Sequence, residues 1–439
     1  MYGTKKKNLR ILEDLREMIG SEGFKEKHRQ SERDFTRNRV LSFVGLVVSQ
    51  INLMSKSLSV EVSRFVERFI GPSLDYSKQA FSKCRSKLKA EAFTALNRRL
   101  VSSFYADGDY RKWRGYLTLA VDGSTLQLPE SAALAGEFGL AENRGKSMPM
   151  ARTSLLYDVE NGLVVDALLQ PYRTGEPEMA LGHVNLLREL SAASPCLLLF
   201  DRGYPSLWLM ACLQSKGLSF VMRCSAGFLS EVGEFARQAE EDALLELDLE
   251  RSNRLRNRRL LLYLEPGQTK LRVRCVKVRL AGGETEYLLT SLQQLELSSF
   301  QELYHKRWGV ETGLDFHKNV LELENFSART VVGVRQDFEA HMLAVNLSAL
   351  LMADAQQELE REQARKRNRH PYKVNRAVAL GLVKDNLAGL LMGKEPAEQV
   401  YERLKGKIKR RKEALRPGRS FKRQRKLHYK FNMNKRQVI

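Results

Sequence analysis

Apolar residues recur every three or four positions through roughly the first hundred residues, and this spacing predicts helices. Leu41, Val44 and Val48 follow it, and a Gly-Pro pair at 71–72 interrupts it. The stretch 73–93 then combines apolar positions with a Lys/Arg face, as the second helix of a helix-turn-helix does. Many basic surface helices share this pattern, so DNA contact by the stretch stands beside that simpler interpretation.

From residue 116 onward the pattern changes to short apolar runs. The runs 119–121 and 196–200 are continuously apolar and are followed directly by Asp122 and Asp201, which predicts two strands that are buried on both faces and end in an acid. Residues 154–171 predict a hairpin that turns at an Asn-Gly pair. Helices are expected over 177–194 and 206–217, and a strand over 218–225. Strands that alternate with helices in this way indicate an α/β core.

Residues 226–297 break the alternation and predict an inserted β-rich lobe, with extended segments at 244–250, 259–265, 271–280 and 286–292. A long helix follows from Ser298 to about Leu323, and Ser299 with Glu302 has the spacing of a capping box. Another helix is expected over 331–361.

These patterns predict five parts of the chain. They are a helical N-terminal DNA-binding domain (1–110), the two parts of the core (111–225 and 298–360), the inserted lobe between them (226–297), and a basic helical C-terminal region (361–439).

Charge narrows the choice of partner. The 439 residues include 73 Lys and Arg against 52 Asp and Glu, a net charge of +21, which favours a polyanion. Residues 403–439 hold sixteen of these basic residues and one acid, and so carry +15. We interpret this tail as an arm for the phosphate backbone, although a solvated end is the simpler alternative.

Several other classes of protein are disfavoured. No apolar stretch is long enough to span a bilayer, and the N-terminus has no signal-like apolar segment, so we expect a cytoplasmic protein without a membrane partner. The five cysteines form no C-x-x-C pair, which argues against a structural zinc site.

Carboxylates carry the candidate chemistry. Asp122 and Asp201 end two predicted strands, where α/β sheets commonly bind ligands, although aspartate at a strand end also often caps a turn. On the helix after residue 298, Tyr304, Arg307, Glu311 and Lys318 share one face.

The choice of the third carboxylate stays open at this level. Arg307 and Glu311 also have the spacing of a surface ion pair. Asp315 and Glu322 fall near the same face, so helical geometry does not select Glu311. Carboxylates with neighbouring cations suit Mg²⁺-dependent phosphodiester chemistry, in which two ions activate the attacking oxygen and stabilise the leaving one.

The spacing Tyr304-x₂-Arg307-x₃-Glu311-x₆-Lys318 resembles the Y-R-E-K signature of IS4-family DDE transposases of bacterial insertion sequences. The segments V-D-G-S-T at 121–125 and F-D-R-G-Y at 200–204 resemble the first and second aspartate regions of that family. SKQAFSKCRSKL, beginning at residue 77, resembles its N-terminal DNA-binding helix.

The resemblance implies an RNase H-like core in which Asp122, Asp201 and Glu311 form the catalytic, metal-binding triad. Mg²⁺ would be the cofactor, and Mn²⁺ would substitute. Tyr304, Arg307 and Lys318 would contact the transposon-end DNA. A homodimer would hold two ends, nick them to free 3′-hydroxyls, and join these to target DNA. The expected setting is a bacterial cytoplasm, in association with the nucleoid.

One departure concerns a hairpin intermediate. Some members of this family place a tryptophan in the inserted lobe, but residues 226–295 of this chain contain none. Two other functions compatible with the fold are a metal-dependent nuclease that never joins ends and a non-catalytic DNA-binding regulator. The intact triad favours an enzyme over the regulator.

Overall fold

The computed structural model describes residues 3–37, 39–52, 57–143, 146–190, 194–251, 254, 257–280, 283–307, 309, 323–366, 370–393 and 395–415. Contacts divide the chain into two compact units. The first comprises 1–109, 126–151 and 317–439, and the second comprises 110–125 and 152–316. The five parts predicted from the sequence stay a prediction.

The first unit is mainly helical. Its N-terminal segment forms α1 (Gly3–Gly20), α2 (Glu22–His28), α3 (Phe43–Ile51), α4 (Leu58–Phe69), α5 (Lys78–Arg85) and α6 (Glu91–Tyr105). Its C-terminal segment forms α14 (Val331–Ala364), α15 (Arg376–Met392) and α16 (Ala397–Arg410). The small elements α7 (Ala132–Phe138), β2 (Leu140–Asn143), β10 (Tyr372–Val374) and β11 (Lys412–Ala414) complete its described part. The predicted helices of the first hundred residues and over 331–361 are therefore confirmed.

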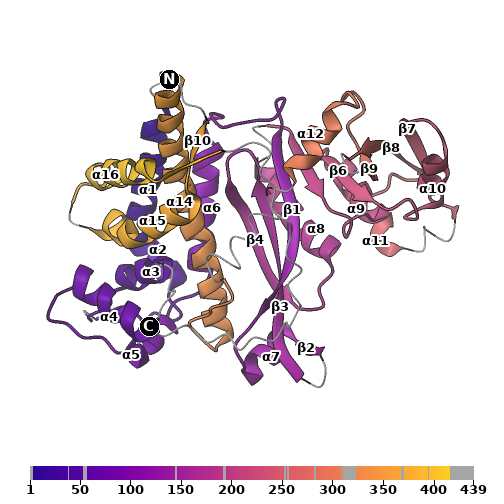
Figure 1. Ribbon diagram of the computed structural model, residues 1–439. Coiled ribbons are helices and arrows are strands. Elements are labelled where there is room, and N and C mark those ends of the chain that lie inside the picture. The colour runs from indigo at the N-terminus through magenta and orange to yellow at the C-terminus, as the bar shows by residue number, and fades with distance from the viewer. Residues whose placement is uncertain are drawn as a thin grey trace. The chain divides into compact units, whose positions relative to one another are not determined.

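The long helix α14 organises this unit. It packs against α1, α3 and α6 from the N-terminal segment and against α15 and α16 from the C-terminal one (Figure 1). Phe93, Leu96, Leu347 and Leu351 are completely buried among these helices. Burial of such side chains stabilises the fold by about 1.5–3 kcal/mol each, so the two ends of the sequence share one hydrophobic core.

The basic stretch 73–93 is not one helix. Ser77 caps α5 by accepting a hydrogen bond from the Ala80 amide, and α5 ends at Arg85. The chain then forms an isolated bridge between Leu88 and Arg29 before α6 begins. Pairing with a distant segment therefore divides the stretch, which local helical spacing does not reveal.

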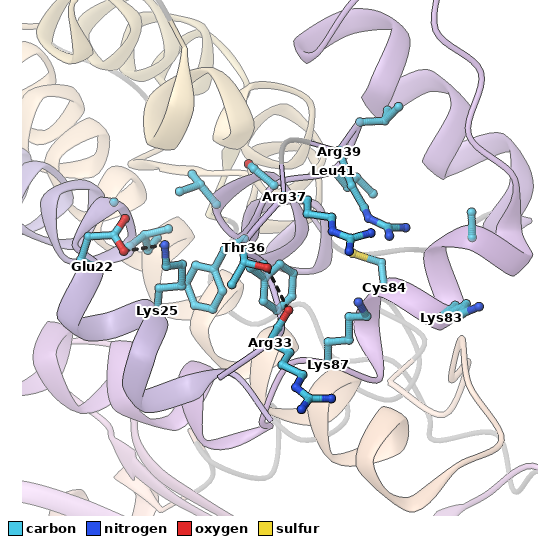
Figure 2. A pocket seen from close by; sticks show the side chains of 18 of the residues that line it. Glu22, Lys25, Arg33, Thr36, Arg37, Arg39, Leu41, Lys83, Cys84 and Lys87 are labelled. Carbon is cyan, nitrogen blue, oxygen red and sulfur yellow. Dashed lines mark hydrogen bonds and ion pairs between the residues drawn. The ribbon is translucent and has the colours of Figure 1, made fainter. Parts of the chain in front are cut away.

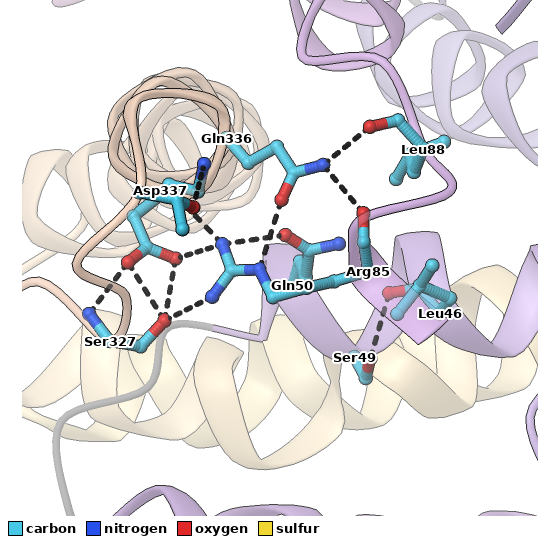
Figure 3. Close-up of polar contacts among 10 residues, drawn as sticks. Leu46, Ser49, Gln50, Arg85, Leu88, Ser327, Gln336 and Asp337 are labelled. Carbon is cyan, nitrogen blue, oxygen red and sulfur yellow. Dashed lines mark hydrogen bonds and ion pairs between the residues drawn. The ribbon is translucent and has the colours of Figure 1, made fainter. Parts of the chain in front are cut away.

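A buried arginine joins α5 to α14. Arg85 is only 4% exposed, and its guanidinium donates hydrogen bonds to Gln336 Oε1 (2.9 Å), the Gly333 carbonyl (2.9 Å) and Asp337 Oδ1 (2.8 Å). It also reaches Ser327 Oγ at 2.5 Å and Gln50 Oε1 at 3.2 Å (Figure 3). These bonds compensate the desolvation of a buried charge.

A second buried titratable group lies on the same helix. His341 of α14 is 5% exposed, and burial lowers its pKa to about 4, with Asp337 opposing the shift. The unfolded chain therefore binds a proton below about pH 6.5 that the folded chain takes up only near pH 4. The lowered pKa of His341 therefore has no effect on the free energy of unfolding above about pH 6.5, and it lowers this free energy progressively as the pH falls from 6.5 towards 4.

We predict that His341→Leu weakens this pH dependence. Between pH 6.5 and pH 4 the variant should lose about 3 kcal/mol less unfolding free energy than the unchanged protein, the equivalent of the pKa difference. Urea unfolding at several pH values, followed by circular dichroism, measures this slope. His305→Leu, at an exposed position, is the control. Equal slopes for the unchanged protein and His341→Leu would contradict the prediction.

The second unit contains most of a nine-stranded sheet with the order β2-β3-β1-β5-β6-β9-β8-β7, in which β4 also pairs with β3. β1 (Leu117–Gln127), β5 (Cys196–Phe200) and β6 (Ser219–Cys224) are parallel neighbours. β3 (Lys146–Asp158) and β4 (Leu163–Pro171) form the predicted hairpin, with Gly162 at a positive φ of 73°. The order β4-β3-β1-β5-β6 fits an RNase H-like core, and the α/β prediction is confirmed.

Helices connect the parallel strands. α8 (Glu176–Leu190) and α9 (Leu207–Ser215) match the two predicted helices and contact one another. After β6 come α10 (Ser230–Arg237), β7 (Asp242–Asp248), α11 (Arg258–Leu261), β8 (Lys270–Arg279) and β9 (Thr285–Thr290). The β-rich character of 226–297 is confirmed, and β9 extends the main sheet by pairing with β6. The strand predicted over 259–265 is wrong, because α11 occupies its first part.

Two local predictions need correction. β1 does not end at Asp122 but continues to Gln127, and its residues 122–125 are half-buried rather than at a strand terminus. The capping box is also wrong. α12 (Ser299–Lys306) begins without a side-chain cap, and Glu302 instead accepts a hydrogen bond from the Trp113 indole at 3.0 Å. Of the predicted long helix, α12 covers the start, and residues 310–322 lie outside the described part.

Candidate active site

Strand register places the two predicted aspartates beside one another in the second unit. In the parallel pair β1–β5 the last aligned residues are Val121 and Phe200, and Asp122 and Asp201 come next on their respective strands. Both aspartates are half-buried, whereas the residues before them are fully buried. The sheet therefore brings two carboxylates separated by 79 positions to one place where its buried interior meets solvent.

The next strand adds a cation. β6 runs parallel to β5 with Met222 aligned to Phe200, so Arg223 follows the same register. Its guanidinium pairs with Asp201 Oδ1 at 2.8 Å and with Glu286 Oε1 on β9 at 2.6 Å. Burial opposes the charge on Arg223, but the Glu286 hydrogen bond and the nearby Tyr304 and Asp201 raise its pKa overall. A permanent positive charge thus lies against the second aspartate.

Helix α12 brings Tyr304 to the same carboxylate. Its hydroxyl donates to Asp201 Oδ1 over 3.5 Å, and the side chain is 4% exposed. Burial raises the Tyr304 pKa and Asp201 raises it further, so the phenol stays protonated and able to donate. Arg307 is 1% exposed, with its guanidinium 5.2 Å from the Tyr304 ring centre. These two predicted DNA contacts are therefore buried, Tyr304 against Asp201 and Arg307 against Tyr304, and their DNA role stays a prediction.

The remaining two residues of the predicted signature, Glu311 and Lys318, lie outside the described residues. Asp315 and Glu322, the alternatives to Glu311 on helical geometry, lie outside them as well. The structure therefore does not test which carboxylate completes the triad.

A second carboxylate–cation pair flanks the aspartates on the other side. Glu176, at the start of α8, pairs through Oε1 with Arg152 of β3 at 3.0 Å. Its Oε2 lies so close to Gly203 that a β-carbon at that position would collide with it. A larger residue at position 203 would therefore have to move this carboxylate. Burial, followed by the charges of Asp122 and Glu176, raises the pKa of Tyr204, so its hydroxyl is neutral.

A buried Asp–His–Ser chain lies behind this region. His183 Nδ1 is 2.7 Å from Asp166 Oδ2, and its Nε2 is 3.0 Å from Ser154 Oγ. The order of these groups is the same as in the Asp–His–Ser catalytic triad of a serine hydrolase. Ser154 and His183 are both 0% exposed, so no substrate reaches the hydroxyl. We interpret the chain as a structural network that fixes β3, β4 and α8 to one another.

The donor atoms at the aspartates suit a hard divalent cation. Carboxylate oxygens are the ligands that Mg²⁺ prefers, and each aspartate is half-buried, within reach of solvent. Thiolate ligands are disfavoured, because burial raises the pKa of Cys196 and Cys224 to about 12. Within the described ranges, no group of three His, Cys, Asp or Glu side chains is arranged to hold a metal. Two carboxylates alone do not complete such a site.

Sequence reasoning missed four charged residues around the aspartates: Arg223, Glu286, Glu176 and Arg152. Arg223 left one signal, a cation inside the otherwise apolar run 218–225. The other three belong to elements whose pairing partners the sequence does not specify. Their contribution appears only when the strand order is known.

A family model described as a transposase DDE domain matches residues 113–347, more than half of the chain. The chain belongs to this DDE transposase family. The match begins before β1 and ends within α14, so it includes both aspartates, the Y-R-E-K spacing and the segment between them. A search of curated proteins finds no match to this transposase.

Among solved structures, the transposase is similar to a piggyBac transposase synaptic complex with hairpin DNA. The two share 13% sequence identity with a TM-score of 0.45, over 96% of this chain and 87% of the other. Among the described residues, no helix has the length and apolar character needed to cross a membrane.

Proposed function

We propose that this chain is a DNA transposase that cleaves phosphodiester bonds at the terminal inverted repeats of an insertion sequence and joins the 3′-hydroxyl ends to target DNA. The observation that carries the proposal is that Asp122 and Asp201 directly follow the aligned pair Val121 and Phe200 of two neighbouring parallel strands in a DDE transposase domain. The finer assignment to the IS4 group, and to a bacterial element, rests on the spacing of Tyr304, Arg307, Glu311 and Lys318.

Asp122 and Asp201, with Glu311, would hold two Mg²⁺ ions, and Mn²⁺ would substitute. Bound there, the ions would activate the attacking oxygen and stabilise the leaving oxygen. Hydrolysis and strand transfer each exchange one P–O bond for another, so one set of carboxylates serves both steps.

The surrounding side chains would position these groups. Tyr304 donates to Asp201 and orients its carboxylate. Arg223, held by Glu286, supplies a fixed cation beside Asp201 that offsets negative charge when phosphate is present. Arg307 and Lys318 are proposed as further DNA contacts, and a homodimer is proposed to hold the two ends together.

A strand-joining experiment tests this function. The full chain would be incubated with Mg²⁺ and labelled duplexes that carry the DNA flanking its gene, either intact or already cut at the repeat boundary. The unchanged protein should nick the intact duplex and join the pre-cut end to a plasmid. Glu311→Gln preserves shape and removes the charge, so it should bind DNA and do neither.

Each alternative has its own outcome. Nicking without joining of pre-cut ends would replace the transposase proposal with a nuclease. Binding without nicking by the unchanged protein would favour a regulator. Equal nicking by the unchanged protein and Glu311→Gln would move the third carboxylate to Asp315 or Glu322.

A further inference from the structure

The first unit contains a cavity of about 1200 Å³ that is separate from the aspartates (Figure 2). Its walls are the end of α1, the start of α2, residues 32–37 and 39–41 of the loop that follows, the first residues of α3, and α5. None of the candidate active-site residues lines this cavity, so the proposed catalytic function does not account for it.

Positive charge dominates the lining. Six cations contribute to it against two acids, Glu22 and Glu32. The cations are Lys25, Arg33, Arg37, Arg39, Lys83 and Lys87.

Two of these cations are neutralised by a neighbouring acid. Lys25 pairs with Glu22 at 2.5 Å, and Lys87 pairs with Asp34 at 3.3 Å. In the part of the chain that the structure describes, the other four have no carboxylate within ion-pair distance and are exposed: Arg33, Arg37, Arg39 and Lys83. Charges gathered in a concave wall reinforce one another and attract a polyanion.

A helix terminus faces the same cavity. Ser42, Phe43 and Val44 line it and form the N-cap and first turn of the nine-residue α3. Ser42 Oγ accepts the hydrogen bond of the Gly45 amide. The first-turn amides of Phe43 and Val44 have no acceptor within an α-helix, and the positive end of the helix dipole favours an anion there.

Specific contacts hold described residues in and beside the loop that carries three of the arginines. Phe35 adopts a positive φ of 59°, and its ring packs edge-on against Phe43 at 5.3 Å. The Gln30 amide donates to the Lys87 carbonyl at 2.8 Å, which ties the loop to the end of α5. A non-glycine residue in this conformation is held by its surroundings, and such sites often have a functional reason.

Cysteine chemistry does not account for the cavity. Cys84 lines it near Tyr76 and Arg39, yet burial raises the pKa of its thiol. A reactive or metal-binding cysteine requires the opposite shift. Cys84 therefore does not make the cavity a reactive-thiol or metal site.

We propose that this cavity binds backbone phosphates of duplex DNA. The inference rests on the proposed function for its choice of polyanion, and it adds where that polyanion is held. Four exposed cations on long side chains, three from the loop and one from α5, suit several phosphates of a duplex better than a single small anion. Contacts of this kind position DNA without reading its sequence. The cavity is thus a phosphate clamp built from loop 32–41, α3 and α5 together.

The experiment compares two quadruple variants in the full chain. The first replaces Arg33, Arg37, Arg39 and Lys83 with glutamine. The matched control replaces four exposed cations of the same unit that do not line the cavity: Arg10, Arg98, Arg365 and Lys407. Fluorescence anisotropy with a labelled duplex would measure affinity over a range of salt concentrations, and thermal unfolding would verify both folds.

Each phosphate contact contributes a slope of about 0.9 to the dependence of log affinity on log salt. We expect the cavity variant to lose about 2–4 from this slope and the control variant less than about 1. The change should be similar for unrelated duplex sequences, because phosphates are common to all of them.

Three results would overturn the proposal. They are an unchanged slope in the cavity variant, an equal loss in both variants, or lost affinity for a labelled acidic peptide with DNA affinity unchanged. The binding result is independent of catalysis. If the unchanged protein did not cleave DNA but the cavity variant still lost this salt dependence, the phosphate-binding proposal would stand and the transposase proposal would be wrong.

Discussion

Asp201→Asn and Asp122→Asn should each lower the rate of DNA cleavage by about 10³-fold or more, equivalent to roughly 4 kcal/mol of transition-state stabilisation. Asparagine preserves the shape of the side chain but removes the charge that a divalent cation requires. In Asp122→Asn the side-chain carbonyl oxygen can still accept the bond from the Gly123 amide, which is 2.9 Å from Asp122 Oδ1. In Asp201→Asn, the Arg223 guanidinium still has its ion pair with Glu286. We therefore expect a folded but inactive protein.

Initial rates of nicking at saturating DNA, over a range of Mg²⁺ concentrations, measure this effect. Asp248→Asn is the matched control, because Asp248 is an exposed residue at the end of β7. It makes the same chemical change in the same unit and should retain the full rate. A tenfold effect or less at either predicted ligand would remove that residue from the metal site.

Arg85→Met should reduce the unfolding free energy by about 3–5 kcal/mol, the typical cost of removing one partner from a buried charged network. Methionine approximates the length of the arginine stem but donates no hydrogen bond. Asp337 would lose the guanidinium that faces it at 2.8 Å, and the Gly333 carbonyl and Gln336 would each lose a donor. Urea unfolding followed by circular dichroism gives the difference.

Arg99→Met provides the contrast. Arg99 makes a two-pronged contact with Asp14 at 2.6 and 2.8 Å, but its side chain is 52% exposed. Exposed pairs typically contribute less than about 1 kcal/mol, so this variant should unfold almost as the unchanged protein does. The double variant Arg85→Met/Asp337→Leu removes both charges and should recover part of the loss. Equal small effects for Arg85→Met and Arg99→Met would contradict a structural role for the buried network.

The two aspartates could be proposed from sequence because each follows a continuous apolar run. Such runs are typical of parallel strands buried on both faces, and carboxylates after them are easily recognised. The predicted end of β1 was wrong, because half-buried residues such as Ser124 continue the strand without an apolar signal. Local pattern thus located the carboxylates but not the length of the strand.

Arg223 and Glu286 show what local pattern lacks. Arg223 and Glu286 are 63 positions apart, and they meet because β9 pairs antiparallel with β6. Tertiary packing, not local sequence, determines this strand pairing. Helical spacing similarly groups Tyr304 with Arg307 but gives no sign that both are buried or that Tyr304 contacts Asp201. The role of Glu302 was misassigned for the same reason, since its partner Trp113 is distant in sequence.

The packing of α1 against α15 and α16 also constrains how the first unit folds. Besides its contacts with α6 and α14, α1 has partners among residues 376–410, which lie far from it along the chain. Closing so long a loop is slow, and the apolar faces of these helices stay exposed until it closes. The second unit ends at residue 316, so its contacts can form earlier. A chain truncated beyond that point would retain the candidate active-site aspartates of the second unit but would lack helices that complete the core of the first.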